Sequence, residues 1–202
     1  MSILQPWNIV FLIGFVIYVV TRGIFANRTK VNESMEHRIG LQEMVLLPAM
    51  LITGLLFPVI YLFTPLFSFA DYELPDWIHG CGLVIMVAGL WLFWRSHADL
   101  GLNWSATLEM RKGHAIIKHG VYRRIRHPMY AAIWLFSIGQ ASLLNNWLAG
   151  WAVVGAFALM YVLRTPIEEQ MMRDTFGKDY EDYMAETGRI FPLVIGRTHS
   201  SG

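Results

Sequence analysis

Long apolar runs separated by short charged stretches constrain this chain more than any other feature of its sequence. A helix needs about 20 apolar residues to cross the roughly 30 Å of hydrocarbon in a bilayer. Five runs have or approach that length, and they cover residues 6–25, 44–67, 77–97, 129–147 and 149–164. Only 15% of the 202 residues are charged, against about a quarter in soluble domains. The sequence therefore predicts an all-α integral membrane protein with five transmembrane helices, a cytoplasmic connecting segment and a C-terminal helix.

Two of these runs carry further local signals. The second contains Pro58, which a membrane helix tolerates because neighbouring helices can satisfy the freed backbone groups. One kinked helix is expected there; two helices within 44–69 are the alternative, with few residues left for each crossing. Asn145 and Asn146 separate the last two runs and predict a tight turn between antiparallel helices.

The positive charges predict which side of the membrane each loop occupies. All sixteen Lys and Arg residues lie within 22–38, 95–126 or 164–197. The loop over 70–76 has three acidic residues and no cation, and residues 145–148 carry no charge. With five crossings the three basic stretches fall on one side, which the positive-inside rule makes cytoplasmic. We therefore expect an external N-terminus and a cytoplasmic C-terminus.

Charge and motif patterns exclude several functional classes. A net charge of +1 provides no field that would attract a nucleic acid, so no nucleic-acid partner is expected. The histidines lack the HExxH and CxxC patterns of metal sites, so no metal is expected. No GxGxxG motif follows a strand, and no Walker loop or GxSxG motif is present. A reaction site is expected in the two segments on the cytoplasmic side, residues 98–128 and 164–197.

Taken singly, the motifs of these two segments also have structural interpretations. Pro128 suits the first turn of the fourth helix, where its missing N–H costs nothing. Arg126 and Tyr130 then serve as interfacial anchors. The run from Thr165 to Glu168 fits a capping box with Thr165 as N-cap, which would open a surface helix over 166–186.

As an ordered set, however, the motifs between residues 103 and 192 resemble those of the isoprenylcysteine carboxyl methyltransferases, and more widely those of the membrane phospholipid methyltransferases. The matching pieces are Gly113-His114, Gly120-Val121-Tyr122, Arg126-His127-Pro128-Met129-Tyr130, Arg164, Glu168-Glu169, Phe176-Gly177 and Tyr180. The first two apolar runs match the family in hydrophobicity alone. A short chain of this kind is similar to prokaryotic members, which implies a prokaryotic inner membrane.

This resemblance implies a single membrane methyltransferase domain, with three helices in 1–97 and a catalytic half in 98–197. It implies methyl transfer from S-adenosyl-L-methionine to the carboxylate of a lipid-like substrate related to isoprenylcysteine. Arg164 matches the family arginine that meets the substrate carboxylate, and Arg126 matches a second arginine close to the reaction site. The implied cofactor contacts are His114, Ala115, Ile116, Ile117, Tyr122, His127, Pro128, Met129, Tyr130 and Glu168.

The expected chemistry needs positioning more than acid–base catalysis. A sulfonium is an activated methyl donor and a carboxylate is already a nucleophile, so the protein has to orient both and exclude water. Glu168 is expected to accept the cofactor's ammonium group, and the start of the fourth helix its carboxylate. The alternatives are a phospholipid amine N-methyltransferase, a nicotinamide-dependent membrane reductase and a non-catalytic membrane protein. Arg164 and Arg126 favour an anionic acceptor.

Overall fold

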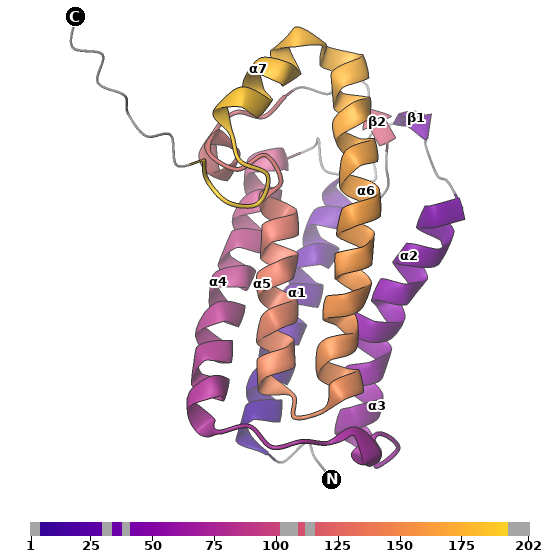
Figure 1. Ribbon diagram of the computed structural model, residues 1–202, viewed down its shortest axis with the longest axis vertical. Helices are drawn as coiled ribbons and strands as arrows, with labels where there is room; N and C mark the ends of the chain where they lie inside the picture. Colours follow the sequence, from indigo (N-terminus) through magenta and orange to yellow (C-terminus); the bar gives the residue numbers. More distant parts are fainter. Residues whose placement is uncertain (1–4, 30–33, 38–40, 102–108, 112–115, 194–202) are drawn as a thin grey trace, which may run out of the picture.

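The protein is a bundle of five helical rods that lie side by side (Figure 1). The computed structural model describes residues 5–29, 34–37, 41–101, 109–111 and 116–193. The rods are α1 (Pro6–Thr29), the joined α2 (Leu41–Leu51), η2 (Ile52–Leu56) and α3 (Phe57–Phe63), then α4 (Asp76–Leu100), α5 (Pro128–Leu143) and the joined η6 (Trp147–Trp151) and α6 (Ala152–Phe176). The shorter elements are β1 (Ser34–His37), η3 (Ser68–Ala70), β2 (Glu109–Arg111), η5 (Gly120–Arg123) and α7 (Lys178–Glu186). Successive rods run in opposite directions, so α7 lies at the end of the bundle opposite the start of α1 (Figure 1).

Four of the rods are long and apolar enough to cross a membrane. They are Pro6–Asn27, Met44–Phe63, Asp76–Leu100 and Trp147–Phe176. The remaining rod, α5, has 16 residues, a length of about 24 Å that falls short of the roughly 30 Å hydrocarbon core. The helical membrane fold is confirmed, whereas five crossings stay a prediction. The fourth helix ends before the expected residue 147 because the chain becomes extended at Leu144 and Asn146 caps the next helix.

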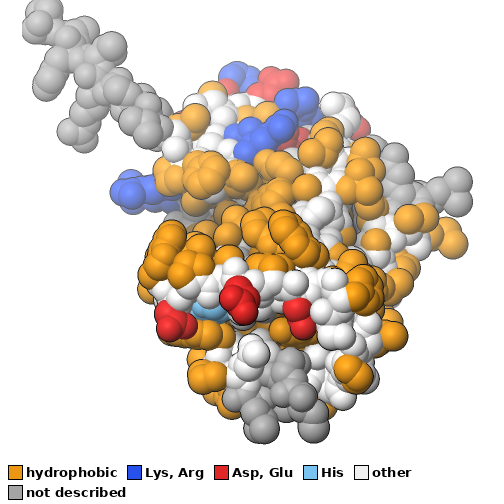
Figure 2. Space-filling view, turned by 60° about the horizontal axis from the view of Figure 1, so that its bottom comes forward, with side chains coloured by type: hydrophobic (Ala, Val, Ile, Leu, Met, Phe, Trp, Pro, Cys, Tyr) orange, Lys and Arg blue, Asp and Glu red, His pale blue; other side chains and the backbone are white. Residues whose placement is uncertain are grey.

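The surface of the bundle agrees with a membrane environment. Large apolar side chains are exposed along the rods, such as Ile13 on α1, Val84 on α4 and Val162 on α6. In the view of the end where α1 begins, acidic side chains stand among hydrophobic ones (Figure 2). The Lys and Arg side chains visible in that view lie toward the other end. The charge asymmetry of the sequence is thus also an asymmetry between the two ends of the bundle.

Small residues let α4 and α5 pack closely along their length. A Cβ atom on Gly89 of α4 would lie 2.9 Å from the backbone nitrogen of Phe136, and one on Gly139 of α5 would lie 2.7 Å from the Cβ of Met86. Close backbone approach of this kind is a common basis of helix association in membranes. This contact fixes the position of α5, whose first residues belong to the candidate site described below.

The second rod is one continuous irregular helix, as the proline pattern suggested. A π-helical turn over Ile52–Leu56 joins α2 to α3 and ends two residues before Pro58. A proline ring clashes with the carbonyl four residues earlier, and a wider turn relieves that clash. The alternative of two separate helices is not needed.

The expected helix over 166–186 is wrong in both its start and its course. Pro166 lies inside α6, which continues to Phe176, and the buried Thr165 makes no N-cap. The break comes at Gly177, whose φ of 52° and N–H bond to the carbonyl of Arg173 (2.8 Å) end the helix in the way typical of glycine. A short antiparallel pair of β1 and β2 is present beside the helices, and the all-α class is confirmed.

Candidate active site

The segment before α5 and the segment after α7 lie side by side, although more than 60 residues separate them in the sequence. The N–H of Arg126 donates to the carbonyl of Gly188 (2.9 Å), and that of His127 donates to the carbonyl of Arg189 (2.8 Å). The N–H of Gly188 donates to the carbonyl of Arg124 (3.2 Å). These bonds form a short parallel ladder, which we call the 124–127/188–189 ladder. It joins the two regions in which the sequence predicts a site.

Glu169 on α6 is the centre of a charged network next to this ladder. Its side chain is 2% exposed and accepts hydrogen bonds from Arg126 Nε (2.8 Å) and His127 Nε2 (3.2 Å) on Oε1. Arg189 contacts both oxygens, with Nε 3.1 Å from Oε1 and Nη2 2.7 Å from Oε2. The bond to Glu169 raises the pKa of the Arg189 guanidinium. A carboxylate buried to this extent needs such compensation, because an unpaired buried charge is costly.

The neighbouring Glu168 has a different environment. Its side chain is 33% exposed, and Oε2 accepts a hydrogen bond from the hydroxyl of Tyr130 (2.6 Å). Its Oε1 lies 4.0 Å from Nδ1 of His127. A carboxylate can accept about four hydrogen bonds, so Glu168 retains acceptor capacity on its exposed side. Glu169 is thus fully hydrogen-bonded within the protein, whereas Glu168 can accept further hydrogen bonds.

Aromatic rings close the site toward the interior of the bundle. The rings of His127 and Tyr130 are stacked, with centroids 5.4 Å apart. The Tyr130 ring also makes edge contacts with Phe157 and Tyr161 of α6, and Trp134 contacts the same two rings one turn further along α5. Glu168 and His127 therefore have a polar side toward the ladder and an apolar wall between α5 and α6.

The turn η5 places Tyr122 beside the same region through two anchors. Asp99 of α4 accepts the N–H of Val121 (2.9 Å), close to Gly120, whose φ is +57°. The hydroxyl of Tyr183 on α7 donates to the carbonyl of Tyr122 (2.7 Å). Burial raises the pKa of the Tyr183 hydroxyl, so this donor stays protonated to a higher pH than an exposed phenol does. The position of Tyr122 is thus set jointly by α4 and α7.

The structure brings together most of the residues that the sequence singles out. The start of α5 lies next to Glu168, which contacts His127 and Tyr130. The turn η5 with Tyr122 directly precedes the ladder. Arg126 points to Glu169 and to the carbonyl of Thr187. Arg164 is half-buried on α6, one turn before Glu168 and on the same face. Ile116 and Ile117 are partly buried in the segment that leads to η5, while His114 and Ala115 lie outside the described residues.

Several residues of the network were not among the predicted site residues, although Glu169 belongs to a matching motif. They are Asp99, Glu169, Tyr183, Thr187 and Arg189. The paired glutamates were a visible signal, but their roles depend on the register of α6. Because α6 runs through Pro166, Thr165 and Glu169 share its buried face and Glu168 lies beside them. An expected helix start at Pro166 concealed this relation.

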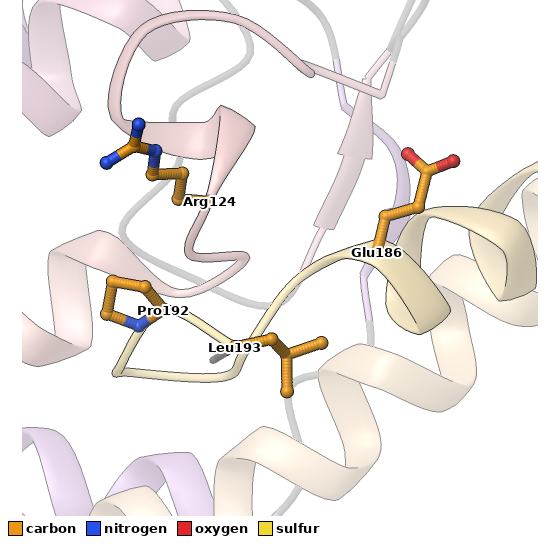
Figure 3. A pocket seen from close by; sticks show the side chains of 4 residues that line it. All are labelled: Arg124, Glu186, Pro192 and Leu193. Carbon is orange, nitrogen blue, oxygen red and sulfur yellow. The ribbon is translucent and has the colours of Figure 1, made fainter. Parts of the chain in front are cut away.

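A separate hollow of about 280 Å³ is lined by Arg124, Glu186, Pro192 and Leu193. Arg124 follows η5, Glu186 ends α7, and the other two belong to the C-terminal segment (Figure 3). Ligand pockets usually measure about 300–1,000 Å³. This hollow is slightly smaller and includes none of the predicted site residues.

Comparison with known proteins gives consistent matches. Residues 77–179 match the model of a family described as phospholipid methyltransferase. A protein-S-isoprenylcysteine O-methyltransferase of Tribolium castaneum is 29% identical over 136 residues, which are 66% of this chain and 48% of the relative. The corresponding enzyme A of Arabidopsis thaliana is 24% identical over 157 residues, 74% of this chain and 80% of the relative. The chain thus spans about half the length of the first relative and most of the second.

The fold is also similar to that of a solved protein. The structure of the eukaryotic intramembrane Ras methyltransferase ICMT superimposes with a TM-score of 0.58 at 22% identity, covering 96% of this chain and 70% of the other. At this identity the likeness concerns the fold. It extends over nearly all of the chain, including the N-terminal rods outside the family match.

Proposed function

We propose, from the premise that this chain belongs to the phospholipid methyltransferase family, that it transfers a methyl group from S-adenosyl-L-methionine to the carboxylate of a lipid-like, isoprenylcysteine-type substrate in the membrane. The observation that carries the proposal is the pair of adjacent glutamates. Glu169 is saturated by Arg126, His127 and Arg189, and this leaves the partly exposed Glu168 facing the start of α5. The names of the relatives in Tribolium and Arabidopsis supply the acceptor class.

The residues around Glu168 fit a zwitterionic cofactor. Glu168 has remaining acceptor capacity for an ammonium group. The first turn of α5, which begins at Pro128 and includes Met129, offers backbone N–H groups and the positive end of a helix dipole to a carboxylate. Tyr122, with Tyr130, provides aromatic surface for an adenine ring. When bound, S-adenosyl-L-methionine would supply a methyl group already activated on a sulfonium.

Arg164 is proposed to orient the acceptor carboxylate. It lies on the face of α6 that carries Glu168, one turn closer to the middle of the bundle. Its planar guanidinium can hold a carboxylate through two parallel hydrogen bonds. A carboxylate attacks as the free anion, so no general base is needed. The aromatic wall of Tyr130, Trp134, Phe157 and Tyr161 excludes water, and a water-poor site favours a reaction that removes two opposite charges.

We further propose that the end with the site faces the cytoplasm, that α5 is a fifth, short crossing and that the membrane is a prokaryotic inner membrane. The Lys and Arg residues within the described part of the chain lie toward the end with the site, which supports this orientation under the positive-inside rule. A cytoplasmic site also suits a water-soluble cofactor. The lipid-like acceptor would reach it from the bilayer.

The proposal is tested with detergent-purified protein, S-adenosyl-L-methionine carrying a labelled methyl group, and two acceptors. One acceptor is a small S-prenylated cysteine, and the other is phosphatidylethanolamine. We expect a base-labile methyl ester on the first. A base-stable methylated amine from the second would replace the proposed acceptor with a phospholipid amine, and failure to bind S-adenosyl-L-methionine would refute the methyltransferase proposal.

Variants on α6 then test the assigned roles. Arg164→Ala is expected to lower kcat/KM for the acceptor by about 10- to 100-fold, a magnitude typical of lost hydrogen bonding between charged groups. Glu168→Gln is expected to weaken binding of the cofactor by a similar factor while the chain stays folded. Arg173→Ala is the matched control, because Arg173 lies near the end of the same helix and its backbone bond to Gly177 survives the change. Unchanged turnover in Arg164→Ala would remove its assigned role.

A further inference from the structure

The C-terminal segment after α7 enters the site through three separate links. Its backbone forms the 124–127/188–189 ladder with the residues before α5. The carbonyl of Thr187 accepts a hydrogen bond from the guanidinium of Arg126. The side chain of Arg189 binds Glu169 with two nitrogens. Neither the family match, which ends at residue 179, nor the sequence motifs assign a role to this segment.

The hydrogen bonds on Glu169 are divided unequally between its two oxygens. Oε1 accepts from Arg126, His127 and Arg189. Oε2 accepts from Arg189 Nη2 at 2.7 Å, its one hydrogen bond among those described. The carboxylate is 2% exposed, so water cannot easily replace a lost donor. Without the Arg189 side chain, Oε2 would gain a partner only if the carboxylate turned toward Arg126 or His127.

Such a rotation of the Glu169 carboxylate would move His127, which lies between Glu169 and Glu168. His127 is 6% exposed, with Nε2 at 3.2 Å from Glu169 and Nδ1 at 4.0 Å from Glu168. The same residue donates its backbone N–H to the carbonyl of Arg189. Arg189 therefore sets the backbone of His127 directly and its ring through Glu169. The ring in turn stacks on Tyr130, whose hydroxyl holds Glu168.

We propose that Arg189 is a positioning residue for the methyl transfer, which fixes His127 and Glu168 through the bidentate contact with Glu169. This inference rests on the proposed function and deepens it. Arg189 acts on the cofactor side, because the chain of contacts from Glu169 through His127 and Tyr130 ends at Glu168. Its loss should therefore raise KM for S-adenosyl-L-methionine more than it lowers kcat. The Arg189 side chain is 46% exposed, so the fold tolerates its replacement better than that of a buried partner.

The test compares Arg189→Gln, Arg189→Lys and the control Arg123→Gln in full-length protein in detergent. Arg123 is exposed on η5, close to the same ladder. S-adenosyl-L-methionine is titrated by calorimetry, and thermal unfolding is followed on the same samples. We expect about a tenfold loss of affinity in Arg189→Gln, comparable to one charge-assisted hydrogen bond. Arg189→Lys should recover part of the affinity, because an ammonium keeps the charge but not the two-point contact.

A double-mutant cycle separates positioning from general destabilisation. If Arg189 acts through His127, Arg189→Gln should have little further effect on affinity in a His127→Ala background. Full additivity in this cycle, or wild-type affinity in Arg189→Gln, would overturn the inference while leaving the proposed function intact. If the wild-type protein itself binds no S-adenosyl-L-methionine, the proposed function fails and the inference falls with it.

Discussion

Side-chain hydrogen bonds stabilise both ends of the bundle. At one end the central side chain is fully paired, whereas at the other a glutamate keeps acceptor capacity. At the end where α1 begins, Asn146 donates to the carbonyl of Phe67 and to Asp71, both at 2.7 Å, and accepts the N–H groups of Leu148 and Ala149. These four bonds use its full capacity. At the other end Glu169 binds two arginines and a histidine, while its neighbour Glu168 keeps acceptor capacity on an exposed side.

This difference distinguishes a polar group that only stabilises the fold from one that can also bind a ligand. A polar group whose every donor and acceptor is paired within the chain has nothing left to offer a ligand. The Asn146 end therefore joins η6 to the loop after α3, and the charged network, in which Glu168 keeps acceptor capacity, lies at the end proposed for the chemistry. The comparison leads to predictions in which stability and activity respond differently at the two ends.

The largest effect is expected from Glu169→Ala, at the charged end. Removal of one partner from a buried ionic network leaves the others uncompensated, so we expect a loss of about 3–5 kcal/mol in the free energy of unfolding and loss of methyl transfer. Thermal unfolding and cofactor binding in detergent measure the two. The control Glu168→Ala should lower affinity with a much smaller loss of stability, because that side chain is 33% exposed. Equal destabilisation by both changes would contradict the division of roles between the glutamates.

Asn146→Ala tests the other end. This change removes a helix cap and one donor each from Asp71 and from the carbonyl of Phe67, which keeps the N–H of Ala70 (2.9 Å), so we expect a loss of about 2–4 kcal/mol in stability. The affinity of the folded protein for S-adenosyl-L-methionine should stay unchanged. Ser142→Ala is the control, because its hydroxyl bonds only to Ile138 O of its own helix among the contacts described. A loss of affinity in Asn146→Ala beyond that expected from unfolding would break the comparison.

Gly120→Ala gives an intermediate effect at the charged end. A side chain at φ +57° is strained, and the added Cβ would meet the carboxylate of Asp99, so we expect a loss of about 1–3 kcal/mol and weaker cofactor binding. Gly101→Ala is a close control, since Gly101 has φ +56° with nothing within 4 Å of the added atom. The difference between the two variants measures the contact with Asp99 without the backbone strain. Identical results would show that this contact does not position η5.

Local sequence patterns were sufficient for the rods and for the polarity of the bundle. Apolar runs of membrane length predict the helices, Pro128 opens α5, and the distribution of Lys and Arg separates the two ends. Each of these properties depends on residues close together in the chain. The same local rules failed at Pro166, where a break was expected: α6 continues through the proline to Phe176, as helices in a membrane protein can when neighbouring groups satisfy the freed carbonyl.

Pairings between distant residues could not be predicted from the sequence. Arg126 and Glu169 are 43 positions apart, and Arg189 follows Glu169 by 20. No periodicity links such positions, and the identity of the buried glutamate depends on one residue of helical register. The family resemblance selected residues that do lie together, since His127 and Tyr130 both contact Glu168; that they bind a cofactor stays a prediction. It did not indicate that the C-terminal segment completes this neighbourhood.

The smallest effect is expected from Tyr183→Phe, which removes one neutral hydrogen bond between α7 and the carbonyl of Tyr122. We expect a loss of about 1 kcal/mol in stability and a change of a few-fold at most in cofactor affinity.

Burial raises the pKa of the Tyr183 hydroxyl, so the folded state favours the protonated phenol. The stabilising contribution is therefore fully present below the usual tyrosine pKa of about 10 and is lost as the pH rises through the higher folded-state pKa. The stability difference between wild type and Tyr183→Phe should be constant from about pH 6 to about pH 9, as unfolding measurements at several pH values can check. A difference that changes within this range would mean that a group other than the phenol links α7 to η5, and the charged network would then extend further from Glu169 than the hydrogen bonds indicate.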